Sequence, residues 1–255
     1  MSLPNNLAER IKVQLGETQN AITQAASEAH RSDIVKLLAV SKTQPAEAVL
    51  AAAQAGQKSF GENYVQEGIN KILACRAAGH IGEQALTWHL IGPLQSNKTR
   101  LVAELFDWVE SIDRLKIAER LSEQRPAHQG PLQVLVQVNT SGESSKSGCP
   151  ASEAALLCQQ ISALPNLQLR GLMAIPEPVA SEPAQRAACR PLKQLFEQIK
   201  SVLPKPDRFD TLSIGMSHDL VAAIAEGSTQ VRIGTAIFGQ RPTHHCIDYS
   251  TETSP

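Results

Sequence analysis

The sequence lacks the features that mark several large classes of protein. It has 24 lysines and arginines against 25 aspartates and glutamates, a formal net charge of −1, and no basic block interleaved with aromatic residues. Nucleic acid is therefore not expected as the main ligand. No apolar run approaches the length of a membrane span, and residues 1–10 are too polar for a signal peptide. We expect a cytoplasmic protein that does not contact a membrane.

Two further absences narrow the choice of fold and site. The five cysteines are widely scattered, and none forms a CxxC pair or another metal-ligand spacing. We interpret them as thiols of a reducing compartment and predict no metal site. A glycine-rich nucleotide fingerprint is also missing, because the residues at the exit of the first expected strand are Ser41-Lys42-Thr43-Gln44. That absence argues against an open, doubly wound sheet.

What the sequence does contain is a regular alternation of strand and helix patterns. The expected strands are residues 36–42, 58–63, 86–91, 108–112, 132–138, 169–175, 211–215 and 230–233. About eight strand–helix units at this length are typical of a (β/α)8 barrel. A further helix is expected before the first strand. We predict a single α/β TIM-barrel domain over residues 1–242 and a flexible tail over residues 243–255.

The ligand site of such a barrel lies where the strands end, and a phosphate is often held by the turns after the seventh and eighth strands. The first strand carries Lys42 to this end, where apolar neighbours would favour a neutral, nucleophilic amine; a solvated lysine is the alternative. Gly215 and Gly234 allow close backbone approach in the two turns. Ser217, which we expect to cap a helix, and Thr235 offer hydroxyls for a phosphate.

Four other polar features lie close to the same end. Arg232 is inside an apolar strand, so it either pairs with a buried carboxylate or meets a ligand, and we favour the ligand. Asn63 leaves the second strand, and we interpret His89 in the third as a hydrogen-bonded core residue. The segment Asn139–Gly148 is either a mobile lid or a solvated loop. An amine, a phosphate cup and a buried arginine together fit pyridoxal 5′-phosphate (PLP).

Seven short stretches, in order over nearly the whole chain, carry a specific resemblance to known proteins. They are residues 37–43 (LLAVSKT), 60–64 (FGENY), 88–98 (WHLIGPLQSNK), 144–148 (SSKSG), 170–176 (RGLMAIP), 215–217 (GMS) and 231–239 (VRIGTAIFG). In these stretches the chain resembles the pyridoxal phosphate homeostasis proteins, the YggS/PROSC-like PLP-binding family. That family is similar to the N-terminal barrel of alanine racemase, which is of fold type III.

The resemblance implies roles for particular residues. Lys42 would form a covalent aldimine with PLP, and Arg232 would face the pyridine nitrogen. Ser217, Gly234 and Thr235 would hold the phosphate. The full set of implied cofactor-binding residues is Lys42, Asn63, Gly215, Met216, Ser217, Arg232, Gly234 and Thr235.

Two departures from alanine racemase argue against efficient catalysis. No second domain is expected after Gly239, and no tyrosine stands opposite the lysine, since Tyr64 belongs to a family motif and Tyr249 to the predicted tail. An arginine also leaves the pyridine nitrogen unprotonated, which makes the ring a poorer electron sink. We therefore predict no catalytic residue, although a weak racemase-type activity stays open.

The function implied by the resemblance is that of a monomeric PLP carrier or buffer in intracellular PLP homeostasis, in transient contact with apo-enzymes that use the cofactor. Two alternatives come from other classes of protein. One is a fold type III amino-acid racemase, and the other is a Schiff-base aldolase that works without PLP.

Overall fold

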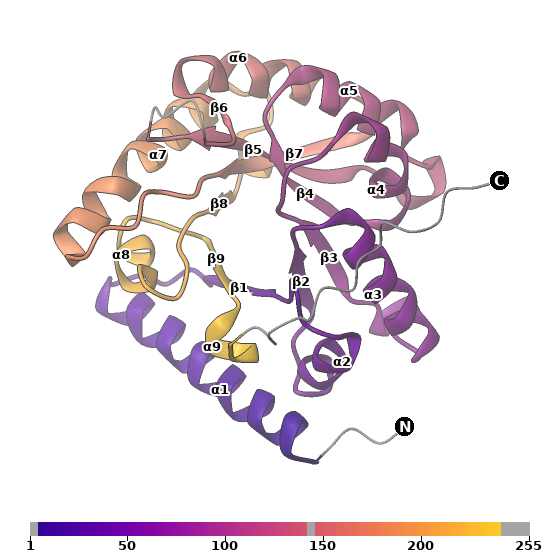
Figure 1. The fold of residues 1–255 in the computed structure, drawn as a ribbon. Helices are drawn as coiled ribbons and strands as arrows, with labels where there is room; N and C mark the ends of the chain where they lie inside the picture. Colours follow the sequence, from indigo (N-terminus) through magenta and orange to yellow (C-terminus); the bar gives the residue numbers. More distant parts are fainter. Residues whose placement is uncertain (1–4, 142–145, 241–255) are drawn as a thin grey trace.

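The computed structural model describes residues 5–141 and 146–240 of the 255-residue chain. Within these residues eight parallel strands close into a barrel (Figure 1), and they are β1 (Lys36–Val40), β2 (Ser59–Glu62), β3 (Thr87–Leu90), β4 (Trp108–Ile112), β5 (Leu132–Asn139), β7 (Leu167–Met173), β8 (Thr211–Ser213) and β9 (Gln230–Ile233). The barrel closes where β9 pairs with β1, with Ala39 beside Ile233. The predicted (β/α)8 barrel is confirmed. A two-residue strand, β6 (Cys149–Pro150), pairs with the end of β5 and was not predicted.

Helices surround the barrel (Figure 1). They are α1 (Asn5–Glu28), α2 (Ala46–Gln54), α3 (Val65–Ala77), α4 (Thr99–Leu105), α5 (Leu115–Gln124), α6 (Ala151–Ser162), α7 (Glu182–Val202), α8 (Leu220–Ala225) and α9 (Thr235–Phe238), with short 3-10 turns at Gly82–Gln84, Ser96–Lys98, Ala127–Gln129 and Pro206–Arg208. The predicted additional N-terminal helix is α1, which packs against α2, α8 and α9. Its apolar positions Ile11, Leu15 and Ile22 are buried, because they repeat at helical spacing on one face.

The barrel has an apolar layer outside the strands and a partly polar interior. Alternate strand residues point outward and pack under the helices, as Val109 of β4 and Val134 of β5 do, each with no exposed surface. Each such side chain contributes about 1.5–3 kcal/mol through its burial. The interior, in contrast, holds hydrogen-bonded side chains that include His89 and Glu110. The apolar layer therefore stabilises the barrel, while the interior is built for polar contacts.

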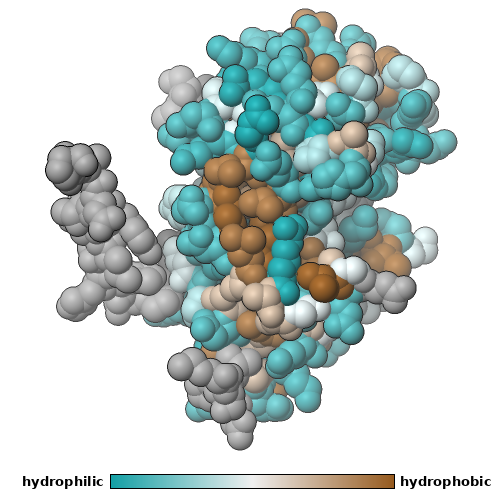
Figure 2. All heavy atoms as spheres, turned by 90° about the vertical axis from the view of Figure 1, so that its right-hand side faces the viewer, coloured by the Kyte–Doolittle hydropathy of each residue, from teal (hydrophilic) through white to brown (hydrophobic). Residues whose placement is uncertain are grey.

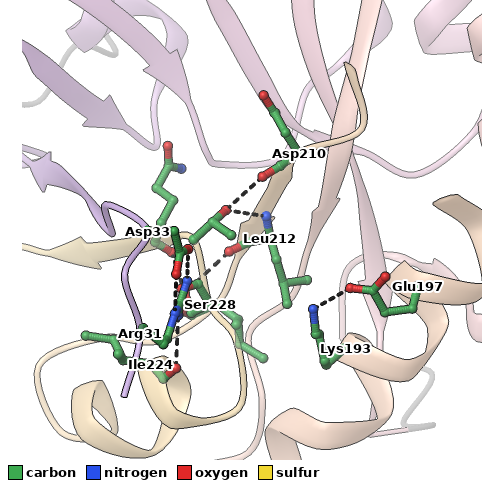
Figure 3. Close-up of polar contacts among 11 residues, drawn as sticks. Arg31, Asp33, Lys193, Glu197, Asp210, Leu212, Ile224 and Ser228 are labelled. Carbon is green, nitrogen blue, oxygen red and sulfur yellow. Dashed lines mark hydrogen bonds and ion pairs between the residues drawn. The ribbon is translucent and has the colours of Figure 1, made fainter. Parts of the chain in front are cut away.

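The end of the barrel is tied to its beginning by side chains as well as by strand pairing. Arg31, which follows α1, donates to the carbonyl of Ile224 at 3.0 Å and to that of Ser228 (Figure 3). The hydroxyl of Thr229 accepts the N–H of Leu212 at 2.8 Å (Figure 3). The Arg31 contacts therefore tie the segment after α1 to the segment between α8 and β9, while the Thr229 contact joins that segment to β8, whose backbone pairing with β9 is short.

Figure 2 shows an apolar band across the side of the molecule that carries α3 and α4. On these helices Leu73 is 52% exposed and Leu101 is 37% exposed.

Among the described residues no helix is both long enough and apolar enough to span a membrane. The predicted tail lies outside the described residues, and so does part of the segment Asn139–Gly148.

Candidate functional site

All the predicted cofactor-binding residues come from four strands that are neighbours in the barrel, in the order β2, β1, β9 and β8. Lys42 follows β1 and Asn63 follows β2, while Arg232 lies in β9. The remaining residues lie in the turns after β8 and β9, and they are Gly215, Met216, Ser217, Gly234 and Thr235. Because parallel strands end on the same side of the barrel, these residues gather at its C-terminal mouth.

The turn after β9 lies directly beside the turn that carries Lys42. A Cβ atom on Gly234 would be only 2.9 Å from the carbonyl oxygen of Val40, so glycine allows the two backbones to approach. On the other side of β1, the N–H of Ser41 donates to the carbonyl of Gly61 at 3.0 Å. Lys42 itself is half-buried. Its position is thus fixed by backbone contacts with both neighbouring strands.

The turn that carries Lys42 is also held by α3. Lys71 of α3 donates to the carbonyl of Ser41 at 2.6 Å, and the carboxylate of Glu67 accepts the N–H of Thr43 at 2.5 Å. Thr43 has a φ of +63°, a conformation that costs a β-branched residue about 1–3 kcal/mol. The contacts on either side of Lys42 maintain this strained backbone, so that the lysine is presented from a rigid turn.

Behind this turn lies a buried ionic cluster that the sequence analysis missed. The ammonium of Lys71 lies 2.8 Å from Glu62 and 2.7 Å from Glu67, and Ser41 donates to Glu62 at 2.5 Å. Lys71 is 4% exposed and Glu62 has no exposed surface. Burial raises the pKa of Glu62, although Lys71 and Ser41 oppose the change. The spacing of Glu67 and Lys71, four residues apart on a predicted helix, was the available signal.

The turn after β8 differs from the prediction in one respect. Ser217 was expected to cap a helix, but α8 begins three residues later and its cap is Asp219. The reason is that the carboxylate of Asp219 turns back and accepts the N–H of Met216 at 2.6 Å, which closes a tight turn before the helix. Ser217 is consequently exposed in this turn, and the N–H of Met216 is already bonded.

Gly215, at the start of the same turn, could not be replaced by a larger residue without strain. Its φ is +103°, and an added Cβ atom would lie 2.5 Å from the Cβ atom of Ala223 in α8. Its carbonyl accepts the N–H of Arg232 at 3.0 Å, which links this turn to β9. The turns after β8 and β9 are therefore close to each other, as a shared phosphate would require.

Arg232 lies in the barrel interior and is 5% exposed. Its Nη1 donates to the hydroxyl of Ser213 and its Nη2 to the carbonyl of Ala174, both at 2.8 Å. Both acceptors are neutral, and among the described residues Arg232 forms no direct ion pair. Burial lowers the pKa of Arg232, opposed by Glu110 and Asp219, but a guanidinium stays cationic. The alternative of direct pairing with a buried carboxylate is not what the described residues show.

Glu110 is the carboxylate closest to this arginine in the hydrogen-bond network. It accepts from Ser213 at 2.7 Å and from Gln230 at 2.7 Å, and it lies 2.7 Å from Nδ1 of His89. Burial acts to raise the pKa of Glu110, but the hydrogen bond and charge of His89 and the charge of Arg232 hold it below its ordinary value. The interpretation of His89 as a hydrogen-bonded core residue is confirmed.

The sequence matches the family model of the alanine racemase N-terminal domain over residues 13–242. A pyridoxal phosphate homeostasis protein of Vibrio cholerae is 58% identical over 240 residues, which are 94% of this chain and 97% of the relative. The protein of the same name from Escherichia coli K12 is 53% identical over 228 residues, 89% of this chain and 95% of that one. The chain belongs to the pyridoxal phosphate homeostasis protein family.

Solved structures agree with this family assignment. The structure of PipY from Synechococcus elongatus with PLP bound is 34% identical, has a TM-score of 0.76 and covers 90% of this chain and 100% of that one. Alanine racemase from Corynebacterium glutamicum, at 16% identity and a TM-score of 0.63, covers 93% of this chain and 63% of the racemase. The second likeness is one of fold.

Membership of the pyridoxal phosphate homeostasis family also explains where the motif residues lie. The stretch 37–43 forms β1 and the lysine turn, and the stretch 60–64 forms β2 and its exit. Glu62, within the second stretch, contacts the cluster that holds the first. A residue of a family motif can therefore act through the backbone that it supports, without facing the mouth of the barrel.

Proposed function

We propose that the protein binds PLP at the C-terminal mouth of its barrel and serves as a carrier or buffer of the cofactor in PLP homeostasis. Relatives at 53% and 58% identity bear the name of pyridoxal phosphate homeostasis protein, and a neighbour of the same fold has been solved with PLP bound. The observation that carries the proposal in this chain is the pairing of β1 with β9, which holds Arg232 in β9 and brings the turn after β9, with Gly234, beside the end of β1 that leads to Lys42.

The residues at the mouth fit the three reactive parts of PLP. The cofactor supplies an aldehyde, a pyridine ring and a phosphate. Lys42 would bond the aldehyde and Arg232 would face the ring nitrogen, with Asn63 beside the ring. The phosphate would lie against the turns after β8 and β9, whose glycines leave no room for a Cβ atom, with Ser217 and Thr235 donating hydroxyl protons. The N–H of Met216 would not bind the phosphate, because it already donates a hydrogen bond to Asp219.

The proposal includes no efficient catalysis by this protein. Arg232 donates and cannot accept a proton, so it leaves the ring nitrogen unprotonated and weakens the ring as an electron sink. Tyr64, which immediately follows Asn63, is 60% exposed and is the N-cap residue of α3. The racemase alternative needs a second acid or base across the cofactor from Lys42, and it predicts racemisation of L-alanine or L-serine. The aldolase alternative predicts that PLP is not bound.

The remaining parts of the proposal concern the whole protein. Residues 1–242 form one PLP-binding domain, which agrees with the single barrel of the described residues and with the family match to residue 242. The protein acts in the cytoplasm as a monomer, and it transfers PLP to apo-enzymes during transient contact.

The proposed function is tested by loading the full chain with PLP, reducing it with borohydride and locating the modified lysine by mass spectrometry. We expect the loaded protein to be yellow before reduction and to carry the label on Lys42 after it, with no label on that peptide in Lys42→Ala. The matched control is Lys58→Ala, an exposed lysine just before β2 at the opposite end of the barrel, which should load normally. Label spread over surface lysines would contradict the proposal, and racemisation of alanine would favour the racemase.

A further inference from the structure

A chain of hydrogen bonds runs through the barrel interior toward the mouth. It begins at His89 on β3, passes through the carboxylate of Glu110 on β4 and the hydroxyl of Ser213 on β8, and ends at the guanidinium of Arg232 on β9. Gln230 bridges Glu110 and Ser213 from the side, at 2.7 Å and 3.2 Å. Of these residues, only Arg232 has a role in the proposed cofactor site.

The direction of each hydrogen bond in this chain is set by the carboxylate. A serine hydroxyl has one proton to donate, and an ionised carboxylate can only accept. Ser213 must therefore give its proton to Glu110, with which it makes a 2.7 Å bond. Its lone pairs are then directed to the N–H of Arg232 at 2.8 Å. Without a carboxylate at position 110, the serine proton could point at the guanidinium, where two donors would face each other.

The charges of Arg232 and Glu110 also indicate that the carboxylate is ionised. Arg232 and Glu110 are both buried, and a buried cation without a compensating anion is costly. Glu110 supplies that anion, and the hydroxyl of Ser213 lies between it and the guanidinium. His89 and Arg232 hold the pKa of Glu110 below its ordinary value against the effect of burial. The guanidinium is thus compensated without being covered by a carboxylate.

We propose that Glu110 is a positioning residue of the cofactor site, which acts through Ser213 to fix the orientation of Arg232. The proposal rests on the proposed function, because Arg232 matters only if a ligand ring lies before it. In this view Glu110 touches no cofactor, and its effect reaches the ring nitrogen only through the serine hydroxyl and the guanidinium. Glu110 and Ser213 then act as one unit.

The test compares Glu110→Gln, Ser213→Ala and the double variant with the wild type, in the full chain loaded with PLP. Two readouts are needed: trapping of PLP on Lys42 by borohydride, and the visible band and Kd of bound PLP. We expect each single variant to trap PLP on Lys42, to shift the visible band and to raise the Kd about tenfold, the effect of one charge-assisted hydrogen bond. The double variant should be no worse than either single one.

The matched control is Asp210→Asn, which removes the partly exposed carboxylate paired with Arg170 and should keep the wild-type band and Kd. A wild-type band and Kd in Glu110→Gln would overturn the proposal, and so would effects that add in the double variant. If Glu110→Gln does not fold, Ser213→Ala decides by itself, because it removes only one hydroxyl. Failure of the wild type to trap PLP would instead overturn the proposed function.

Discussion

The two arginines at opposite ends of the barrel have opposite kinds of partner. Arg170 of β7, near the N-terminal ends of the strands, donates from Nε to Asp210 at 3.0 Å and from Nη1 to Gln133 at 2.9 Å. It also lies over the ring of Trp108, 5.1 Å from its centre. Arg232, near the C-terminal ends, donates to a hydroxyl and a carbonyl. One charge is neutralised by direct contact, and the other is not.

The difference separates a stabilising end of the barrel from a binding end. At the N-terminal end the charge of Arg170 is matched by Asp210, whose pKa burial would raise but Arg170 and Thr211 hold low. Arg170 therefore needs no anion or hydrogen-bond acceptor from a ligand. Arg232, held in place by neutral groups, keeps its attraction for a ligand acceptor. The division agrees with the general rule that barrel enzymes and binding proteins use the C-terminal ends of their strands.

The largest effect should come from removing the buried cation behind the mouth. Lys71→Met leaves Glu62, which has no exposed surface, without its cationic partner. Breaking a buried pair in this way costs about 3–5 kcal/mol, so the free energy of unfolding should fall by that amount. Urea denaturation measures it. The control is Lys193→Met, which removes an exposed helical pair with Glu197 and should cost only a few tenths of a kcal/mol.

Loss of Arg232 should affect PLP binding far more than loss of Arg170. Arg232→Met removes a charged donor, worth about 1.5–3 kcal/mol, so the Kd for PLP should rise by about ten- to a hundredfold. Arg170→Met should leave the Kd unchanged and lower the free energy of unfolding by about 1 kcal/mol, because its pair with Asp210 is partly exposed. Titration of PLP by absorbance, with urea denaturation of both variants, makes the comparison. Equal effects on the Kd would remove the distinction between the two ends.

Much of the fold could be predicted from the sequence, because the barrel depends on local patterns. The apolar runs at Leu132–Val138 and around Lys36–Val40 are strands in the structure as expected. The candidate site followed from those strands, since their ends must meet. Ser217 was assigned wrongly as a cap, because the carboxylate that closes the turn, Asp219, was not distinguishable by spacing.

Contacts between distant segments could not be predicted. Nothing local indicates that Lys71, on α3, reaches the carbonyl of Ser41, thirty positions earlier in the chain. In the sequence Glu110 is a single polar residue of an expected strand. Only the closed barrel brings it into contact with Ser213, and the proposed role of Glu110 in orienting Arg232 depends on that contact. Such contacts depend on the curvature and closure of the barrel, which no window of sequence contains.

Ser217 tests the binding end of the comparison with a smaller change. Ser217→Ala removes one hydroxyl from an exposed turn, so the fold should be unaffected, while a lost charge-assisted bond of about 1.5 kcal/mol raises the Kd for PLP about tenfold. The matched control is Ser201→Ala on α7, which removes an exposed hydroxyl that donates to the carbonyl of Gln198. The measurement is a PLP titration of both variants. An unchanged Kd in Ser217→Ala would mean that the phosphate does not lie against this turn.

The smallest effect concerns acid stability at the N-terminal end. The pKa of Asp210 is lowered in the folded protein, so its pair with Arg170 contributes stability above the ordinary pKa of 3.8 and loses it as the pH falls through the folded value. Asp210→Asn should therefore be less stable than the wild type near neutral pH, by up to about 1 kcal/mol for a partly exposed pair. The gap should close as the pH falls below about 4. Urea denaturation at several pH values measures the gap, and a gap that widened in acid would show that Asp210 does not hold the arginine as an ionised partner.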